Sequence, residues 1–160
     1  MANGVVAVTE QRDGAFRKVS YEVVSEGRRI ADALSCALTV VVMGSGVEAL
    51  AGEIQAFGAD TVLVLDDPGL ADYRTDAYVN GLSACLAPVD PAVVVLGATA
   101  QGKDLAARLA ARLDAGLAMD CTAVAVKGGE IICTRPMFGG KIFADVKIQG
   151  TPQLIVLRPN

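Results

Sequence analysis

Four short apolar runs, each rich in β-branched residues, constrain the fold of this 160-residue chain more than any other feature. The runs lack the alternation of apolar and polar residues that marks a strand with one face in water. Nearly continuous apolar strands are typical of parallel sheets that helices cover on both faces. The four predicted strands are residues 5–8, 39–43, 61–65 and 92–96.

Amphipathic segments lie between these runs and predict the covering helices. They span residues 20–34, 45–54 and 75–86, and a fourth begins near Gly102. The alternation of strand and helix predicts an open, doubly wound α/β domain with right-handed crossovers. The expected architecture is therefore a three-layer α/β/α domain with a mainly parallel sheet, of the Rossmann-like or adenine-nucleotide-hydrolase-like kind.

Two local signals refine the helix limits. Ser45 and Glu48 have the spacing of a capping box at the start of the second helix, and Gly58 suits its left-handed end. Asp104 and Arg108 are spaced four apart on the fourth helix, where an ion pair is favourable.

The pattern changes after residue 120. Residues 122–126 and 131–134 flank Gly128-Gly129 and predict a β-hairpin. Residues 141–148 follow a second glycine pair and alternate, and a last strand covers residues 153–157. The face predicted for the alternating strand comprises Ile142, Ala144, Val146 and Ile148. We therefore expect a single domain over residues 1–160 with antiparallel C-terminal strands.

Composition and charge argue against several function classes. The net charge of −4 and the pI of about 4.8 disfavour a nucleic-acid partner. The chain has no histidine, which removes the Ser-His-Asp and Cys-His nucleophile systems. Its longest apolar stretch, residues 37–43, is far too short for a membrane span.

The cysteines and the N-terminal residues indicate the cellular compartment of the protein. None of the four cysteines forms a C-x-x-C pair, and each lies in an apolar context, so we expect buried thiols and neither a zinc ribbon nor a redox motif. The first residues show no signal sequence. We therefore expect a cytoplasmic protein with reduced cysteines.

The loop of residues 97–104 follows a buried strand and leads into a helix. Ligands of open α/β sheets bind at such strand ends, and free N–H groups at a helix N-terminus attract anions. The candidate binding residues are Gly97, Thr99, Gly102 and Lys103. The competing interpretation is a tight turn capped by Thr99, and Asp104 favours it because its charge would repel a phosphate.

The adjacent acids Asp66 and Asp67 end a strand before a proline. With no third carboxylate nearby in the sequence, a helix-capping or turn role is the better interpretation, and we predict no metal site.

The segment of residues 134–141 has an arginine, a proline, an aromatic residue and a glycine pair in one turn. Pro136 is expected to end or bend the strand. The segment predicts either a docking surface or a structural bend with Phe138 filling the edge of the core. The candidate interface residues are Arg135, Met137, Phe138 and Lys141.

Taken together, these segments resemble the N-terminal domain of the electron-transfer flavoprotein alpha subunit. The order and spacing of the motifs agree along the whole chain. The most specific are the Gly-Lys-Asp-Leu helix start and the Thr-Arg-Pro-Met-Phe-Gly-Gly-Lys turn. The segments that carry the resemblance are Gly97-Ala98-Thr99, Gly102-Lys103-Asp104-Leu105, Gly116-Leu117, Asp120-Cys121-Thr122 and residues 134–141.

The resemblance implies an electron-carrier subunit and not an enzyme. It implies a partner beta subunit and, through the complete heterodimer, exchange of electrons with flavin dehydrogenases. FAD would belong to the heterodimer, on a C-terminal domain that is absent from this chain, and none is expected on the isolated chain. The alternative is a stand-alone module that binds AMP or ATP through residues 97–104. An isolated domain with exposed docking surfaces is also expected to self-associate as a homodimer.

Overall fold

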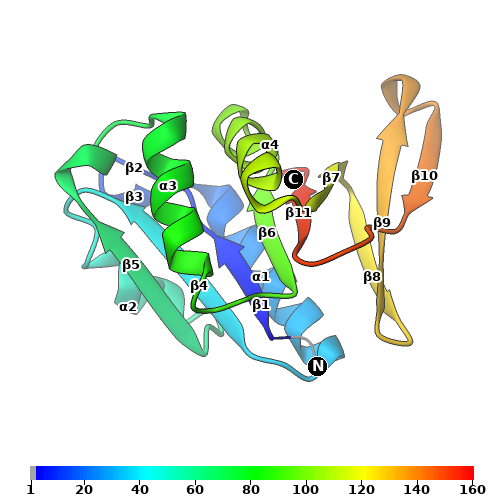
Figure 1. Cartoon of the computed structure of the whole chain (residues 1–160), viewed down its shortest axis with the longest axis horizontal. Helices are drawn as coiled ribbons and strands as arrows, with labels where there is room; N and C mark the ends of the chain where they lie inside the picture. Colours follow the sequence, from blue (N-terminus) through cyan, green and yellow to red (C-terminus); the bar gives the residue numbers. More distant parts are fainter. Residues whose placement is uncertain (1–2) are drawn as a thin grey trace.

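The computed structural model describes residues 3–160 and contains the predicted parallel sheet. Six strands lie side by side, and every neighbouring pair is parallel. Figure 1 shows the sheet with its helices. The spatial order is β5 (Thr61–Asp66), β4 (Leu38–Gly44), β1 (Val5–Val8), β6 (Val93–Gly97), β11 (Gln153–Leu157) and β7 (Gly116–Cys121).

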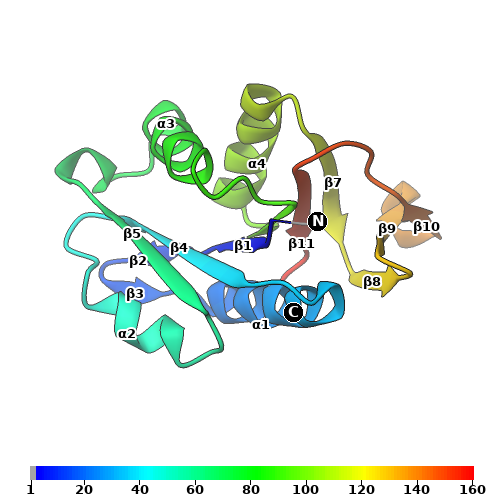
Figure 2. The ribbon, with the colours of Figure 1, turned by 60° about the horizontal axis from the view of Figure 1, so that its bottom comes forward.

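Two pairs of helices cover the two faces of this sheet, which confirms the predicted three layers (Figure 2). Helices α1 (Lys18–Leu34) and α2 (Leu50–Gln55) pack on one face, and α3 (Thr75–Leu86) and α4 (Ala100–Leu113) pack on the other. Successive strand residues point to opposite faces, so each apolar run contributes to both cores. This double burial explains why the runs do not alternate.

Neighbouring residues of β1 illustrate the two cores. Val5 and Ala7 join Val23 and Ile30 of α1 in the first core, where all four side chains are almost fully buried. Val6 lies on the other face of the sheet, in the second core with Leu109 of α4.

Two strands of the sheet differ from the expectation. β7 was not predicted, because its burial does not follow the apolar pattern of the central strands. β11, the predicted last strand, does not join the antiparallel C-terminal strands: it lies inside the parallel sheet, between β6 and β7. The chain therefore leaves the sheet after β7, forms a separate unit, and returns to complete the sheet.

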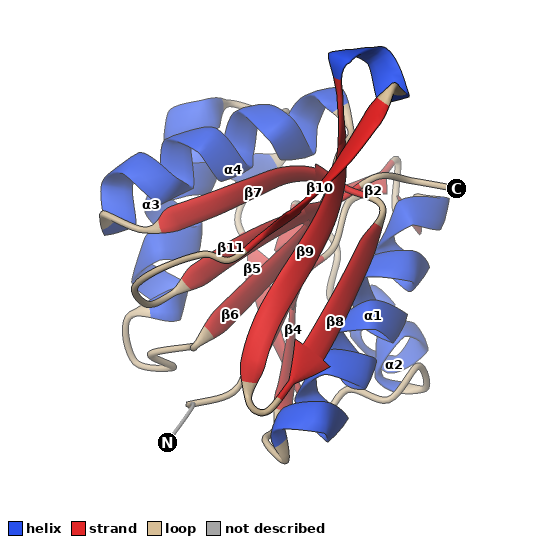
Figure 3. Cartoon of the chain, turned by 90° about the vertical axis from the view of Figure 1, so that its right-hand side faces the viewer, coloured by secondary structure: helices blue, strands red, loops and turns tan. Residues whose placement is uncertain are grey.

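That separate unit is a three-stranded antiparallel sheet, here called the arm, which stands beside edge strand β7 (Figures 1 and 3). Its presence confirms the predicted hairpin and antiparallel C-terminal strands. Its elements are β8 (Ala123–Lys127), β9 (Glu130–Met137), the 3-10 turn η2 (Phe138–Gly140) and β10 (Ile142–Val146). A smaller hairpin, β2 (Gln11–Arg12) and β3 (Ala15–Phe16), precedes α1, and a second 3-10 turn, η1 (Pro68–Leu70), precedes α3.

Strand β9 does not end at Pro136, contrary to one of the two predicted outcomes. β9 continues through it to Met137, and Pro136 pairs in register with Phe143 of β10. β8 pairs with β9 only as far as Thr134, so beyond that residue β9 has a neighbour on one side only. A proline is tolerated in such an edge position because no second ladder needs its N–H group.

The cysteines divide into two pairs by burial, and all four are free thiols. Cys121 and Cys133 are fully buried in the first core, as expected. Cys36 and Cys85 are only partly buried, and burial raises the pKa of the Cys85 thiol. None of the described helices is long and apolar enough to cross a bilayer.

Candidate functional site

The loop of residues 97–104 folds as the tight strand-to-helix turn of the second interpretation. Thr99 is the N-cap of α4, and its hydroxyl accepts a hydrogen bond from the N–H of Gly102 at 2.9 Å. Gly97 and Gly102 are buried and lie against each other, since a Cβ added to Gly102 would sit 1.9 Å from the Gly97 carbonyl oxygen. Lys103 is exposed. Three of the four candidate residues therefore shape the turn itself.

A buried acid that sequence reasoning missed completes this turn. Glu10 lies two residues beyond β1, and its Oε1 atom accepts a hydrogen bond from the Thr99 hydroxyl at 2.6 Å. Its Oε2 atom accepts one from the Arg17 guanidinium at 3.0 Å. The Glu10 side chain is 7% exposed, whereas that of Arg17 is 49% exposed. A charged residue two positions after a buried strand was the signal that could have identified it.

A polar cleft of about 650 Å³ opens next to Glu10. It is bordered by the 11–17 segment, by Ser45, by residues 71–73 and by Gln101, near the carboxyl ends of β1, β4 and β6. None of the four candidate residues of the loop lines it. The cleft thus has the size and place of a ligand site, and at Gln101 it reaches the first turn of α4.

The pyrophosphate of a dinucleotide does not fit this helix N-terminus. The Glu10 carboxylate already lies against the first turn, because a Cβ on Gly102 would be 2.9 Å from its Oε1 atom. A second anion there would meet a like charge at short range. The Glu10 carboxylate therefore lies where a flavin or nucleotide phosphate would approach the first turn of α4.

Asp104 does not form the predicted ion pair with Arg108. Its carboxylate accepts hydrogen bonds from the Thr75 hydroxyl at 2.6 Å and from the Tyr73 hydroxyl at 2.7 Å. Arg108 instead pairs with Asp76 of α3 at 3.1 Å. The two hydroxyl donors lower the pKa of Asp104. These contacts join α4 to the start of α3, and contacts between the two helices took precedence over the expected pairing within one helix.

The predicted capping box of Ser45 and Glu48 is also wrong, because the turn before α2 is capped from another strand. α2 begins later, at Leu50, and its N-cap residue makes no side-chain hydrogen bond. The carboxylate of Asp66, at the end of β5, accepts hydrogen bonds from the backbone N–H groups of residues 46–48. Asp67 accepts the N–H of Gly69 and caps η1. The predicted capping and turn roles of the two acids are therefore confirmed.

The tip of the arm carries the three most exposed large apolar side chains of the described residues, and a fourth lies beside them. Phe138 is 72% exposed, Phe143 62%, Ile142 54% and Met137 40%. Phe138 therefore does not fill the edge of the core, and the interpretation as a structural plug is wrong. Its backbone has a φ of 50°, in the left-handed region that a bulky residue seldom adopts.

The other predicted interface residues lie on the same segment. Lys141 is exposed beside the tip, whereas Arg135 is half-buried in β9 and its Nε atom has no hydrogen-bond partner. The exposure of Ile142 and Phe143 was not predicted from the sequence. Val146, which shares the predicted face with Ile142, is half-buried because it lies next to the main body, whereas Ile142 lies toward the tip.

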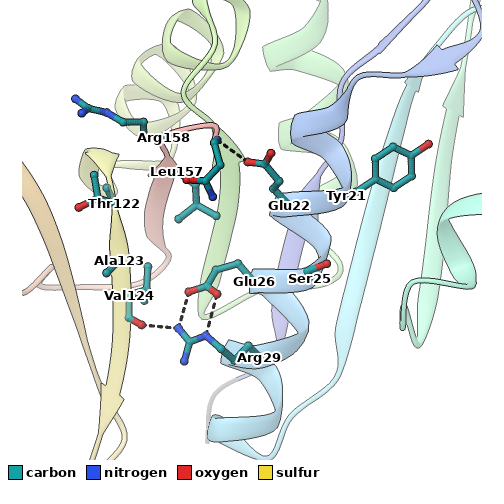
Figure 4. Close-up of a pocket in the computed structure, with 12 residues that line it drawn as sticks. Tyr21, Glu22, Ser25, Glu26, Arg29, Thr122, Ala123, Val124, Leu157 and Arg158 are labelled. Atoms are coloured by element: carbon teal, nitrogen blue, oxygen red, sulfur yellow. Dashed lines mark hydrogen bonds and ion pairs between the residues drawn. The ribbon is translucent and has the colours of Figure 1, made fainter.

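A second cleft, of about 670 Å³, separates α1 from the base of the arm (Figure 4). Arg29 of α1 spans it: its guanidinium pairs with Glu26 and donates to the Val124 carbonyl of β8 at 2.5 Å. Glu22, one turn before Glu26 on α1, accepts a hydrogen bond from the backbone N–H of Asn160 at 3.0 Å. The residues of this cleft thus connect the arm and the last residues of the chain to α1.

These features define a class of protein: a Rossmann-like α/β domain with an internally capped helix N-terminus and a projecting antiparallel arm. The profile of the electron transfer flavoprotein domain matches residues 5–160, so the chain belongs to the electron transfer flavoprotein family.

Curated relatives agree with this assignment. The chain is 42% identical to Protein FixB of Clostridium saccharobutylicum over 98% of its own length and 48% of the relative. It is 41% identical to the electron transfer flavoprotein subunit alpha of Syntrophomonas wolfei, again over 98% of the chain and 48% of the relative. The acryloyl-CoA reductase electron transfer subunit beta of Anaerotignum propionicum is 35% identical over 86% of the chain and 44% of the relative. The chain spans about half the length of these relatives.

Proposed function

We propose that this chain is the N-terminal scaffold and docking domain of an electron-transfer flavoprotein alpha subunit. The family match over residues 5–160 and the relatives named subunit alpha support this proposal. The complete protein would be a heterodimer of alpha and beta subunits that carries electrons between flavin dehydrogenases and an acceptor. We place it in the cytoplasm, where its four free cysteines would stay reduced.

The observation that carries the docking role is the arm tip. Four large apolar side chains are exposed there within seven positions, at residues 137, 138, 142 and 143. Contiguous apolar patches seldom stay bare on soluble proteins, and aromatic residues and methionine are enriched in interface cores. The positive φ of Phe138 adds a conformational cost that no burial within the described chain offsets. Binding of the beta subunit to this tip would bury the four apolar side chains and offset the conformational cost at Phe138.

In this proposal the domain performs no bond chemistry of its own. The cofactor of the complete protein is FAD, which supplies the redox chemistry, and the polypeptide positions it. The start of α4 is already filled by Glu10, which agrees with a flavin held elsewhere in the heterodimer. This chain would contribute the rigid sheet that carries the arm and presents it to the beta subunit.

Co-expression with the beta subunit of the same organism tests the proposal. The tagged 160-residue chain is expected to retain the beta subunit on an affinity column and through gel filtration. The chain expressed alone is expected to be colourless. Stoichiometric yellow flavin on the lone chain, or a folded chain that retains no beta subunit, would contradict the proposal.

A further inference from the structure

Glu10 is a buried acid that the docking role does not use. It lies just beyond β1, where the strand order of the sheet reverses between β1 and β6. Ligands of open α/β sheets bind at this reversal, with their phosphate groups at the N-terminus of the following helix. Two helices start at this reversal, α1 after β1 and α4 after β6, and the Glu10 side chain lies against the start of α4.

The carboxylate of Glu10 takes the donors that a bound phosphate would use. One oxygen accepts the hydroxyl of Thr99, the cap residue of α4, at 2.6 Å. The other accepts the guanidinium of Arg17 at 3.0 Å. The side chain approaches Gly102 so closely that a Cβ there would lie 2.9 Å from Oε1. A carboxylate that is 7% exposed thus sits against the positive end of the helix.

We infer that Glu10 is a built-in anion that closes the phosphate position of this fold. The turn before α4 then forms without any bound nucleotide. Two features of a phosphate site persist beside it: the polar cleft of about 650 Å³, and Arg17, which lines this cleft. The cleft already reaches the first turn of α4 at Gln101, and removing the carboxylate frees both Arg17 and the Thr99 hydroxyl beside it. The ligand class that the unblocked site takes is a phosphate or a phosphate monoester.

The test is a titration of inorganic phosphate and of AMP into the wild-type chain and into Glu10→Ala, followed by calorimetry and thermal unfolding. The wild type is expected to bind neither ligand at this site. The variant is expected to bind both at least about tenfold more tightly, because a like charge has been removed at short range. At about ten times its Kd, a ligand should raise the Tm of the variant by roughly 3–5 °C.

Two further variants sharpen the result. Glu10→Gln keeps the shape of the side chain and removes its charge, so its affinity should lie between those of the wild type and Glu10→Ala. Glu48→Ala is the matched control: it removes one negative charge from an exposed side chain at the same edge of the sheet and should bind like the wild type.

The inference is overturned if the wild type binds phosphate as tightly as Glu10→Ala, or if that variant is folded by circular dichroism and gains no affinity. If Glu10→Ala does not fold, Glu10→Gln decides the question: equal affinity for the wild type and Glu10→Gln overturns the inference. None of these outcomes depends on the beta subunit, so the docking proposal stands or falls separately.

Discussion

The carboxylate of Asp66 accepts a hydrogen bond from the backbone N–H of Val47 at 2.6 Å. It accepts two more from the N–H groups of Gly46 and Glu48. One side chain at the end of β5 therefore satisfies three donors in the turn before α2. These bonds, that from Gly46 above all, lower the pKa of Asp66 because they favour its ionised form.

This arrangement predicts a loss of stability in acid. The pKa of Asp66 is lower in the folded chain than in the unfolded one, so its contribution is present above about pH 4 and is lost as the pH falls through the folded-state value. Asp66→Asn should lower the Tm at neutral pH, and the difference from the wild type should shrink in acid. Thermal unfolding across a pH series measures both effects.

Asp13→Asn provides the control for this series. Asp13 is 96% exposed and has a φ of 54°, which asparagine also tolerates. Its substitution should leave the Tm nearly unchanged at every pH. A Tm difference between Asp66→Asn and the wild type that is the same in acid and at neutrality would show that the carboxylate does not act through its charge.

A second prediction concerns the close approach of Gly97 to Val19. A Cβ on Gly97 would lie 2.3 Å from Cγ2 of Val19. Gly97→Ala should therefore destabilise the chain by about 1–3 kcal/mol through overpacking. Val19→Ala removes the clashing methyl groups, so the double variant should lose less stability than the two single variants together. Urea unfolding of all four proteins measures this coupling.

Gly102→Ala is the contrasting case. Its Cβ would lie 1.9 Å from the backbone oxygen of Gly97, which no side-chain truncation can move. Val19→Ala should therefore rescue Gly97→Ala and leave Gly102→Ala as unstable as before. Strictly additive losses at Gly97 and Val19 would contradict the packing described for this turn.

A third prediction concerns alkaline pH. Burial, with the Asp104 carboxylate beside it, raises the pKa of Tyr73 to about 12. A tyrosine whose pKa is higher in the folded state stabilises the chain fully below its unfolded value of about 10, and this contribution is lost as the pH rises toward the folded value. The Tm of the wild type should fall between about pH 10 and pH 12, and the Tm of Tyr73→Phe should fall less steeply over the same range.

Ultraviolet titration of tyrosinate follows the same group directly. The tyrosinate component with the highest pKa should be absent from the titration curve of Tyr73→Phe and present in that of Tyr21→Phe. The burial of the ring of Tyr78, whose pKa is also raised, makes a matched substitution there less informative. If the component with the highest pKa remains in the titration curve of Tyr73→Phe, its assignment to Tyr73 is contradicted.

The central strands could be predicted from the sequence because burial on both faces leaves a continuous apolar run, as in β1 and β4. β7 could not, because it lies at the edge of the sheet and only Ala118 and Cys121 are buried. The place of β11 between β6 and β7 depends on long-range pairing, which no local pattern encodes.

The capping groups were the least predictable part of the candidate site. Ser45 and Glu48 have the right spacing for a capping box, yet Asp66 reaches the same N–H groups from a neighbouring strand. Glu10 likewise reaches Thr99 from 89 positions away. Apolar periodicity reports burial, whereas these polar contacts depend on which strand ends become neighbours in the sheet.

A fourth prediction concerns the isolated domain. If the arm tip lacks its partner, the chain should self-associate at high concentration, most simply as a two-fold dimer. Sedimentation over a concentration series should show this association, and Phe138→Ser with Phe143→Ser should weaken it. Association that is unchanged in the double variant would place the contact on another surface.

The most direct test of the docking role is the affinity of this chain for the cognate beta subunit, measured by sedimentation or calorimetry with three proteins. Exposed aromatic anchors at an interface cost about 2 kcal/mol or more on truncation, so the Phe138→Ser and Phe143→Ser double variant should bind at least about thirtyfold more weakly than the wild type. Phe57→Ser, which alters an exposed phenylalanine away from the arm, should bind like the wild type. Equal affinity of the wild type and the arm variant, with both chains folded, would contradict the proposal that the arm is the docking surface.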